Sequence, residues 1–127
     1  MLYPDIRAVL DGTPIAHLAT IGADGAPHSV PVWIATRGEH VAIMTDPASL
    51  KARNIARDPR VAISLTVPDE PFAPVILHGR VVGWLAGDEG WAAVDEIARK
   101  YIGQPYGRDQ RRAVALIEVD DQQLGMR

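Results

Sequence analysis

Short runs of β-forming residues alternate along the chain with clusters of Gly, Pro and Asp, a pattern typical of strands joined by tight turns. The cluster Gly22-Ala23-Asp24-Gly25 and the tripeptide Arg37-Gly38-Glu39 have the composition of hairpin turns, so the first three strands should form an antiparallel meander. Pro31 cannot donate to a strand ladder and indicates an edge or a bulge in the second strand. Six strands are predicted, at residues 13–21, 30–36, 40–45, 60–67, 75–85 and 113–119.

Three segments, residues 4–10, 47–57 and 87–102, show helical signals instead. The middle helix is expected to start at Asp46 and Pro47, an N-cap carboxylate followed by proline at the first helical position. It should stop before Pro59, because proline disfavours helical geometry in the residue that precedes it. In the last helix an apolar stripe is formed by Trp91, Val94, Ile97 and Tyr101.

This order of elements predicts a mainly β (α+β) fold. A doubly wound parallel sheet needs repeated alternation of strands and helices, which the chain does not show. A six-stranded antiparallel barrel with two to three short helices packed outside fits better, with any ligand on the rim or between subunits. Gly79 is a plausible bulge in the long fifth strand, and the segment 66–74 is expected to be a proline-rich loop.

Composition limits the classes of function. The 127 residues fit one domain, 1–127, and 47% hydrophobic and 23% charged residues are ordinary values for a globular chain. The net charge of −3 gives no global basic field to hold nucleic acid or an anionic membrane, so neither is an expected partner. The absence of cysteine excludes disulfides and thiol catalysis. With no signal peptide and no apolar run long enough to span a bilayer, a cytoplasmic location is expected.

The helix at 47–57 carries the clearest chemistry. Ser49, Lys51, Arg53 and Asn54 lie in its first turns, beside the end of a strand. Free main-chain N–H groups and the positive end of the helix dipole favour an anion at such a place, and lysine adds a full charge. A phosphate site is therefore one interpretation, and a solvated amphipathic helix is the other.

Other candidate residues give weaker signals. His17, His28, His40 and His78 lack the spacing of metal ligands and are interpreted as ordinary strand residues, although His28 and His78 could line a pocket. Phe72 could cover a planar ligand or simply anchor its loop.

Motifs of acid–base or nucleophilic catalysis are missing: there is no Ser-His-Asp arrangement, Walker loop or GxGxxG. The three tryptophans, Trp33, Trp84 and Trp91, fit a core or a subunit interface. Either the protein is not an enzyme, or a bound cofactor supplies the reactive atom.

Two segments resemble a known family. The run ATIGADGAPHSVPVW at 19–33, and the pattern T-x3-S-x-K-x-R-N-x-x-R-D-P-R-V-A at 45–62, are similar to the pyridoxamine-phosphate-oxidase-like split β-barrel oxidoreductases. Small members that use the deazaflavin coenzyme F420 are the nearest likeness. The resemblance extends to the GRV strand at 79–81 and to a tail ending Gly125-Met126-Arg127.

The resemblance implies a homodimer with two cofactors at the subunit interface. It implies that Lys51 and Asn54 contact the cofactor phosphate, with Ser49 nearby. Relatives often carry arginine where this chain has Ser49, a loss for which Arg53 could compensate. The tricyclic ring would be bordered by the backbone of Ser29, Val30, Pro31, Val32 and Trp33 and by Met44 and Thr45, with Phe72 and Pro74 approaching from a covering loop.

The functional hypothesis is hydride transfer from reduced F420 to a small planar acceptor, with no catalytic side chain assigned and no metal. An FMN-binding oxidoreductase of the same fold is the first alternative. A non-catalytic F420-binding carrier is the second. The short tail after the last predicted strand makes oxidation of vitamin B6 an unexpected activity.

Overall fold

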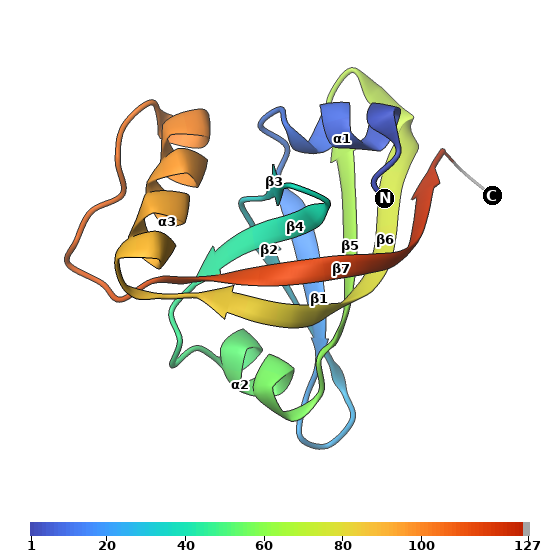
Figure 1. Ribbon diagram of the computed structural model, residues 1–127. Coiled ribbons are helices and arrows are strands. Elements are labelled where there is room, and N and C mark those ends of the chain that lie inside the picture. Colours follow the sequence, from blue (N-terminus) through green and yellow to red (C-terminus); the bar gives the residue numbers. More distant parts are fainter. Residues whose placement is uncertain (126–127) are drawn as a thin grey trace.

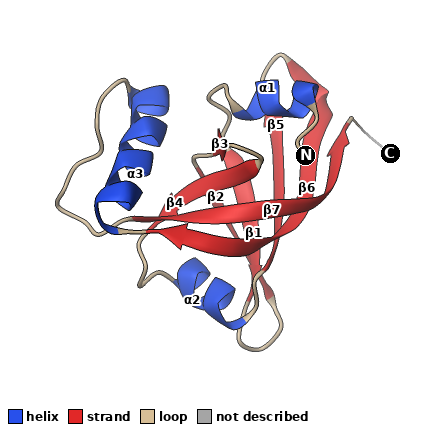
Figure 2. Cartoon of the chain, in the orientation of Figure 1, coloured by secondary structure: helices blue, strands red, loops and turns tan. Residues whose placement is uncertain are grey.

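A curled antiparallel sheet forms the body of the protein, and three helices pack outside it (Figures 1 and 2). The computed structural model describes residues 1–125. The strand order is β2-β1-β5-β6-β7-β4-β3, so β2 and β3 are the edges. The elements are α1 (Pro4–Leu10), β1 (Ala16–Ile21), β2 (Pro27–Val32), β3 (Ala35–Arg37), β4 (His40–Thr45), α2 (Leu50–Arg57), β5 (Arg60–Val67), β6 (Glu70–Leu85), α3 (Gly87–Ile102) and β7 (Ala113–Leu124).

The mainly β, antiparallel barrel fold is confirmed, but the prediction of six strands is wrong. The expected strand at 30–36 is two strands, β2 and β3, separated by Trp33 and Ile34. β2 pairs with β1 as far as Val32, whereas β3 pairs with β4 from Ala35 onward. The single run at 30–36 thus contributes to both edge strands of the sheet. Its composition does not show where pairing with β1 ends and pairing with β4 begins.

The two residues between these edge strands are fixed by α3. The phenol oxygen of Tyr101 accepts a hydrogen bond from Ile34 N (3.1 Å) and donates one to Pro14 O (2.5 Å). Lys100 Nζ donates to Leu10 O (2.8 Å) and to Ile34 O (2.5 Å). These bonds from α3 therefore fix the two-residue link between the edge strands β2 and β3.

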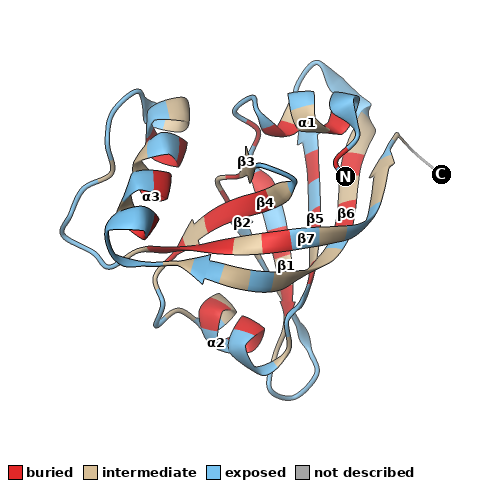
Figure 3. Ribbon diagram, viewed as in Figure 1, coloured by how far each residue is buried: buried red, intermediate tan, exposed pale blue. Residues whose placement is uncertain are grey.

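Apolar side chains fill the barrel interior, where alternate strand positions are buried (Figure 3). Ile6 and Leu10 of α1 close one end of this core. A second apolar cluster packs α3 against the outer faces of β4 and β7, through Ala42, Ala93, Val94, Ile97 and Val114. None of the helices in residues 1–125 is long and apolar enough to cross a membrane.

Gly79 occupies a bulge, as predicted. The register between β6 and β7 shifts between His78 and Gly79. A Cβ atom on Gly79 would lie 2.2 Å from the carbonyl oxygen of Glu118, so only glycine allows this approach of the two backbones.

The start of α2 differs from the prediction. The helix begins at Leu50, and its N-cap is Ser49, whose side chain accepts a hydrogen bond from Ala52 N (3.2 Å). Asp46 instead forms a preceding turn, in which its Oδ1 accepts from Ala48 N (2.8 Å). Aspartate and serine both cap helices well, and the sequence offered two caps three residues apart. The end of α2 before Asp58 and Pro59 is as predicted.

The proline-rich segment 66–74 is a strand hairpin and not the loop that was predicted. β5 and β6 pair as far as Val67 and Glu70, and only Pro68 and Asp69 form the turn. Phe72 and Pro74 consequently lie in β6. The prolines are tolerated because the β5–β6 pairing is irregular here, with a register shift between Leu65 and Val67. β7 is also longer than predicted and pairs with β6 up to Leu124.

Candidate functional site

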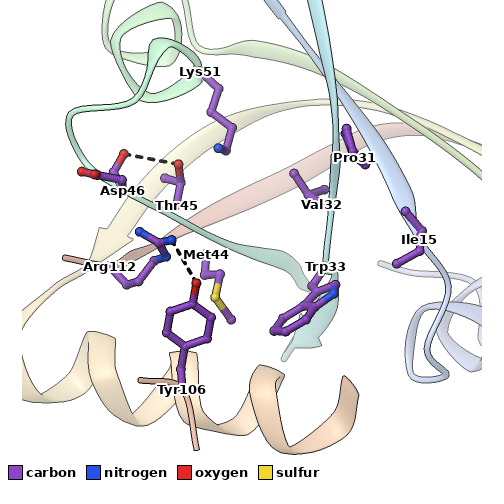
Figure 4. A pocket seen from close by; sticks show the side chains of 10 residues that line it. All are labelled: Ile15, Pro31, Val32, Trp33, Met44, Thr45, Asp46, Lys51, Tyr106 and Arg112. Carbon is purple, nitrogen blue, oxygen red and sulfur yellow. Dashed lines mark hydrogen bonds between the residues drawn. The ribbon is translucent and has the colours of Figure 1, made fainter. Parts of the chain in front are cut away.

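A pocket of about 410 Å³ lies between the end of β2, the end of β4 and the start of α2 (Figure 4). Its walls come from the end of β2, the end of β4, the first turn of α2 and the loop 103–112. The residues that line it are Ile15, Pro31, Val32, Trp33, Met44, Thr45, Asp46, Lys51, Tyr106 and Arg112.

One wall of the pocket is apolar and firmly held. Pro31 and Val32 contribute to it from the end of β2, Trp33 from the link that follows, and Met44 from β4. The Trp33 indole stacks on Tyr101, with ring centroids 5.1 Å apart and planes 6° from parallel. Tyr106 meets the same indole edge-on at 6.3 Å. A flat apolar wall of this kind suits a planar ring.

Lys51 lies on the polar side of the pocket, where its side chain extends from α2 into the space (Figure 4). It is half-buried, and it forms no hydrogen bond or ion pair with any residue in 1–125. Burial lowers the pKa of Lys51, and the charge of Arg112 lowers this pKa further, while Asp46 raises it. A partly desolvated ammonium beside a second cation is stabilised by a bound anion.

Arg112 is the second cation of the pocket. Its Nη2 donates a hydrogen bond to the Tyr106 hydroxyl (2.9 Å), and its guanidinium carbon lies 5.1 Å from the centroid of the Tyr106 ring. Its Nη1 donates to the carbonyl oxygen of Arg111 (2.7 Å). These contacts fix Arg112 opposite Lys51, so the pocket has two positive side chains and one carboxylate, Asp46.

The loop that supplies Tyr106 and Arg112 is tied to α3. Asp95 accepts from both Nη atoms of Arg108 (2.9 and 2.8 Å) and from Tyr106 N (3.2 Å). These bonds, led by that from Arg108, lower the pKa of Asp95 to about 2. Arg108 also lies 4.0 Å from the Trp91 ring centroid. The pocket wall formed by this loop is therefore held in place, although the loop has no regular structure.

Hydroxyl groups organise the strand end beneath Lys51. Thr45 Oγ1 lies 2.9 Å from Ser49 Oγ and 3.3 Å from the carbonyl oxygen of Asp46, to which it donates. Since Ser49 also caps the helix, its hydroxyl is already engaged within the chain. Ser49 thus supports the start of α2 from just outside the pocket lining.

The structure brings together six of the residues predicted from the sequence: Pro31, Val32, Trp33, Met44, Thr45 and Lys51. Ser29 and Val30 lie farther back on β2, where Val30 packs against the barrel core. Phe72 is 84% exposed. Neither Phe72 nor Pro74 lines the pocket of its own chain.

Arg53 and Asn54 lie apart from Lys51. Asn54 is buried under α2, where its Nδ2 donates to Thr20 Oγ1 (3.0 Å) and its Oδ1 accepts from Arg57 Nη2 (3.0 Å). Both residues line a different cavity, between α2 and the turn of the β1–β2 hairpin, which we call the hairpin pocket. Lys51 and Asn54, which the resemblance assigns to one phosphate, therefore line two different cavities.

Sequence reasoning missed four lining residues: Ile15, Asp46, Tyr106 and Arg112. Asp46 was noticed only as a helix cap. The Arg111-Arg112 pair directly before a predicted strand was the one available signal for Arg112, because it places a cation at a sheet end. Within residues 1–125, no cluster of His, Asp and Glu side chains could hold a metal ion.

Comparison with known proteins identifies the family. The profile described as pyridoxamine 5'-phosphate oxidase matches residues 2–124. The chain belongs to the pyridoxamine 5'-phosphate oxidase family. No curated protein gives a significant match.

Solved structures of similar fold cover nearly the whole chain of this pyridoxamine 5'-phosphate oxidase family member. An F420 reductase has 24% identity and a TM-score of 0.83, over 95% of this chain and 98% of its own. A conserved hypothetical protein from Mycobacterium tuberculosis has 25% identity and a TM-score of 0.81, over 98% and 84%. HupZ of Group A Streptococcus has 16% identity and a TM-score of 0.71, over 100% of both chains.

Proposed function

We propose that this protein is an oxidoreductase that binds coenzyme F420 and transfers a hydride from the reduced cofactor to a small planar acceptor. The observation that carries the proposal is Lys51, a half-buried ammonium without a partner in residues 1–125, facing a pocket whose opposite wall is flat and apolar. These residues fit a group with an anionic tail and a planar ring.

Different side chains of the pocket bind the two parts of the cofactor, its anionic end and its ring. Lys51 and Arg112 hold the anionic end by charge-assisted hydrogen bonds, which are stronger than neutral ones. Trp33 and Met44 support the ring, and Pro31 and Val32 limit its position along β2. Because Tyr101 and Tyr106 fix the Trp33 indole, the wall is preorganised before a ligand enters.

A deazaflavin supplies the transferable hydride when it is bound, so we assign no side chain as acid, base or nucleophile. The chain contributes alignment of donor and acceptor in a space from which water is partly excluded. Such alignment can provide several kcal/mol of the rate enhancement, roughly 7–11 in favourable cases.

FMN is the alternative cofactor, and it would use the same two cations for its phosphate. F420 is favoured by the resemblance of residues 45–62 and by the structural similarity to an F420 reductase. A yellow preparation with flavin absorbance would favour FMN. A colourless protein that binds F420 would favour the proposal.

We further propose that two chains form a homodimer that completes the site. Phe72 is 84% exposed, and Val82 and Trp84 of the same strand are 46% and 40% exposed, which leaves apolar area for a partner. In such a dimer Phe72 and Pro74 would approach the pocket of the other subunit. Sedimentation of the wild type and of Phe72→Asp tests this: a wild-type monomer would contradict it.

The direct test is titration of the purified protein with F420 and, separately, with FMN. We expect F420 to bind with a Kd well below about 1 mM, and FMN more weakly. Turnover with quinones, enones and other planar acceptors then distinguishes an enzyme from a carrier. Failure of both cofactors to bind would refute the proposal, and tight F420 binding without turnover would favour the carrier.

A further inference from the structure

The hairpin pocket lies on a different side of α2 from Lys51 and has a volume of about 370 Å³. Its lining combines small and apolar residues of the β1–β2 hairpin with Leu50, which is 47% exposed. The residues that line it are Gly22, Ala23, Asp24, Ala26, Pro27, His28, Leu50, Arg53, Asn54 and Arg57. None of them lines the pocket around Lys51.

The guanidinium groups of Arg53 and Arg57 both line this pocket, and both have N–H groups that form no hydrogen bond within residues 1–125. The side chain of Arg53 is exposed and forms no hydrogen bond or ion pair with residues 1–125. Arg57 donates through Nη2 to Ile21 O (2.8 Å) and to Asn54 Oδ1 (3.0 Å), while its other N–H groups have no acceptor in that part of the chain. The one carboxylate, Asp24, accepts from Ala26 N (3.0 Å). The pocket therefore carries an excess of positive charge.

Arg57 is held in place before any ligand arrives. Asn54 orients it, and Asn54 is itself fixed by its bond to Thr20 Oγ1 (3.0 Å) in the buried layer below α2. A guanidinium group has five N–H donors in a rigid fork that matches phosphate and carboxylate oxygens. The ordering of this side chain therefore adds little to the entropy lost on binding.

We propose that the hairpin pocket is a second binding site, which takes the phosphate or carboxylate group of a small molecule between Arg53 and Arg57. The site is independent of the proposed cofactor pocket, because the two share no lining residue. The small and apolar lining residues leave room for the carbon skeleton of such a ligand.

Amide NMR shifts of the full chain test this proposal, with inorganic phosphate and glutarate as probes and sodium chloride at matched ionic strength as the blank. We expect saturable shifts at the hairpin amides, residues 22–26 and 28, with at least one of the two anions, with a Kd on the order of 1–10 mM. Phosphate binding beside Lys51 would shift a different set, residues 44–46 and 112. The two proposals can therefore fail separately.

Arg53→Gln is the decisive variant, because this exposed side chain has no partner whose loss would perturb the fold. It should weaken anion binding at residues 22–28 about tenfold. Lys51→Gln, and Arg99→Gln on the exposed face of α3, should leave that binding unchanged. Shifts at 22–28 that match the chloride blank, or that persist at full affinity in Arg53→Gln, would overturn the proposal.

Discussion

Two sides of the short helix α2 lead to different chemistry. Lys51 faces a pocket with a flat aromatic wall, whereas Arg53 and Arg57 face the hairpin pocket, which has small residues and no aromatic ring besides His28. Between these two sides, Asn54 and Ile55 are buried against the barrel. Successive residues of a helix are rotated by about 100°, so Lys51 and Arg53, two residues apart, point to opposite sides of α2. The basic residues of one helix can thus line two separate pockets, and the net charge of the helix does not show how they are divided between the pockets.

The largest expected effect is a loss of folding stability, from a substitution on the side of α2 that lines neither pocket. Ile55 is 4% exposed, and Ile55→Ala should reduce the free energy of unfolding by about 2–5 kcal/mol, because it leaves a cavity under the helix. Urea denaturation measures this. Arg53→Gln, on the exposed side, should change the same quantity by less than about 0.5 kcal/mol. Equal losses would mean that α2 is not anchored by its buried face.

A substitution on the side of α2 that carries Lys51 should change the affinity for the cofactor and leave folding stability unchanged. Lys51→Ala is expected to weaken F420 binding by about 1.5–3 kcal/mol, or roughly 10- to 150-fold, because a charge-assisted hydrogen bond is lost. Isothermal titration measures it, with Arg53→Gln as the matched control on the other side. Thermal stability without cofactor should hardly change, since a partly exposed lysine contributes little to folding. Comparable losses of affinity in both variants would refute the division between the two sides.

The buried layer should couple α2 to β1. Asn54→Ala removes the partner of Thr20 Oγ1 and one of the two acceptors of Arg57, and should destabilise the fold by about 1–3 kcal/mol. Thr20→Val removes the other end of the buried bond. In a double-mutant cycle by urea denaturation, the two changes should cost less together than the sum of each alone, by about 0.5–1.5 kcal/mol. Strict additivity would show that the bond does not join the helix to the strand.

The smallest expected effect is on the pH dependence of anion binding. Burial and Arg112 lower the pKa of Lys51 from its ordinary value of 10.5, so this ammonium loses its proton at a lower pH than a free lysine. Anion affinity should be full below that pKa and fall as the pH rises through it. Arg112→Gln should move the fall to higher pH, and Lys51→Arg should abolish it, because guanidinium stays charged. Titrations between about pH 7 and 10.5 decide this.

Much of the fold was accessible from local signals. The bounds of α1, β4, β5 and α3 coincide with the segments predicted from turn residues and periodicity. The missed features depend on partners that are distant in sequence. β2 and β3 differ only in which strand they pair with, and β6 extends past Phe72 because β5 pairs with it.

The pocket was predictable on one wall only. Pro31, Trp33, Met44 and Lys51 belong to segments with recognisable patterns. Tyr106 and Arg112 come from an irregular loop whose course depends on the Asp95–Arg108 pair, and no local pattern announces that pairing. Asn54 shows the opposite failure: its polar side chain suggested a ligand contact, whereas its role in the structure is a buried hydrogen bond.

The two-residue link at Trp33 and Ile34 affects how the ligand preference of this fold could change in evolution. The residues that bring the two margins of the sheet together also present the indole to the ligand. A new shape for that wall would disturb the link between the two edge strands, so we expect substrate range to vary instead through the segment at 103–112, which carries Tyr106 and Arg112 and contributes no strand.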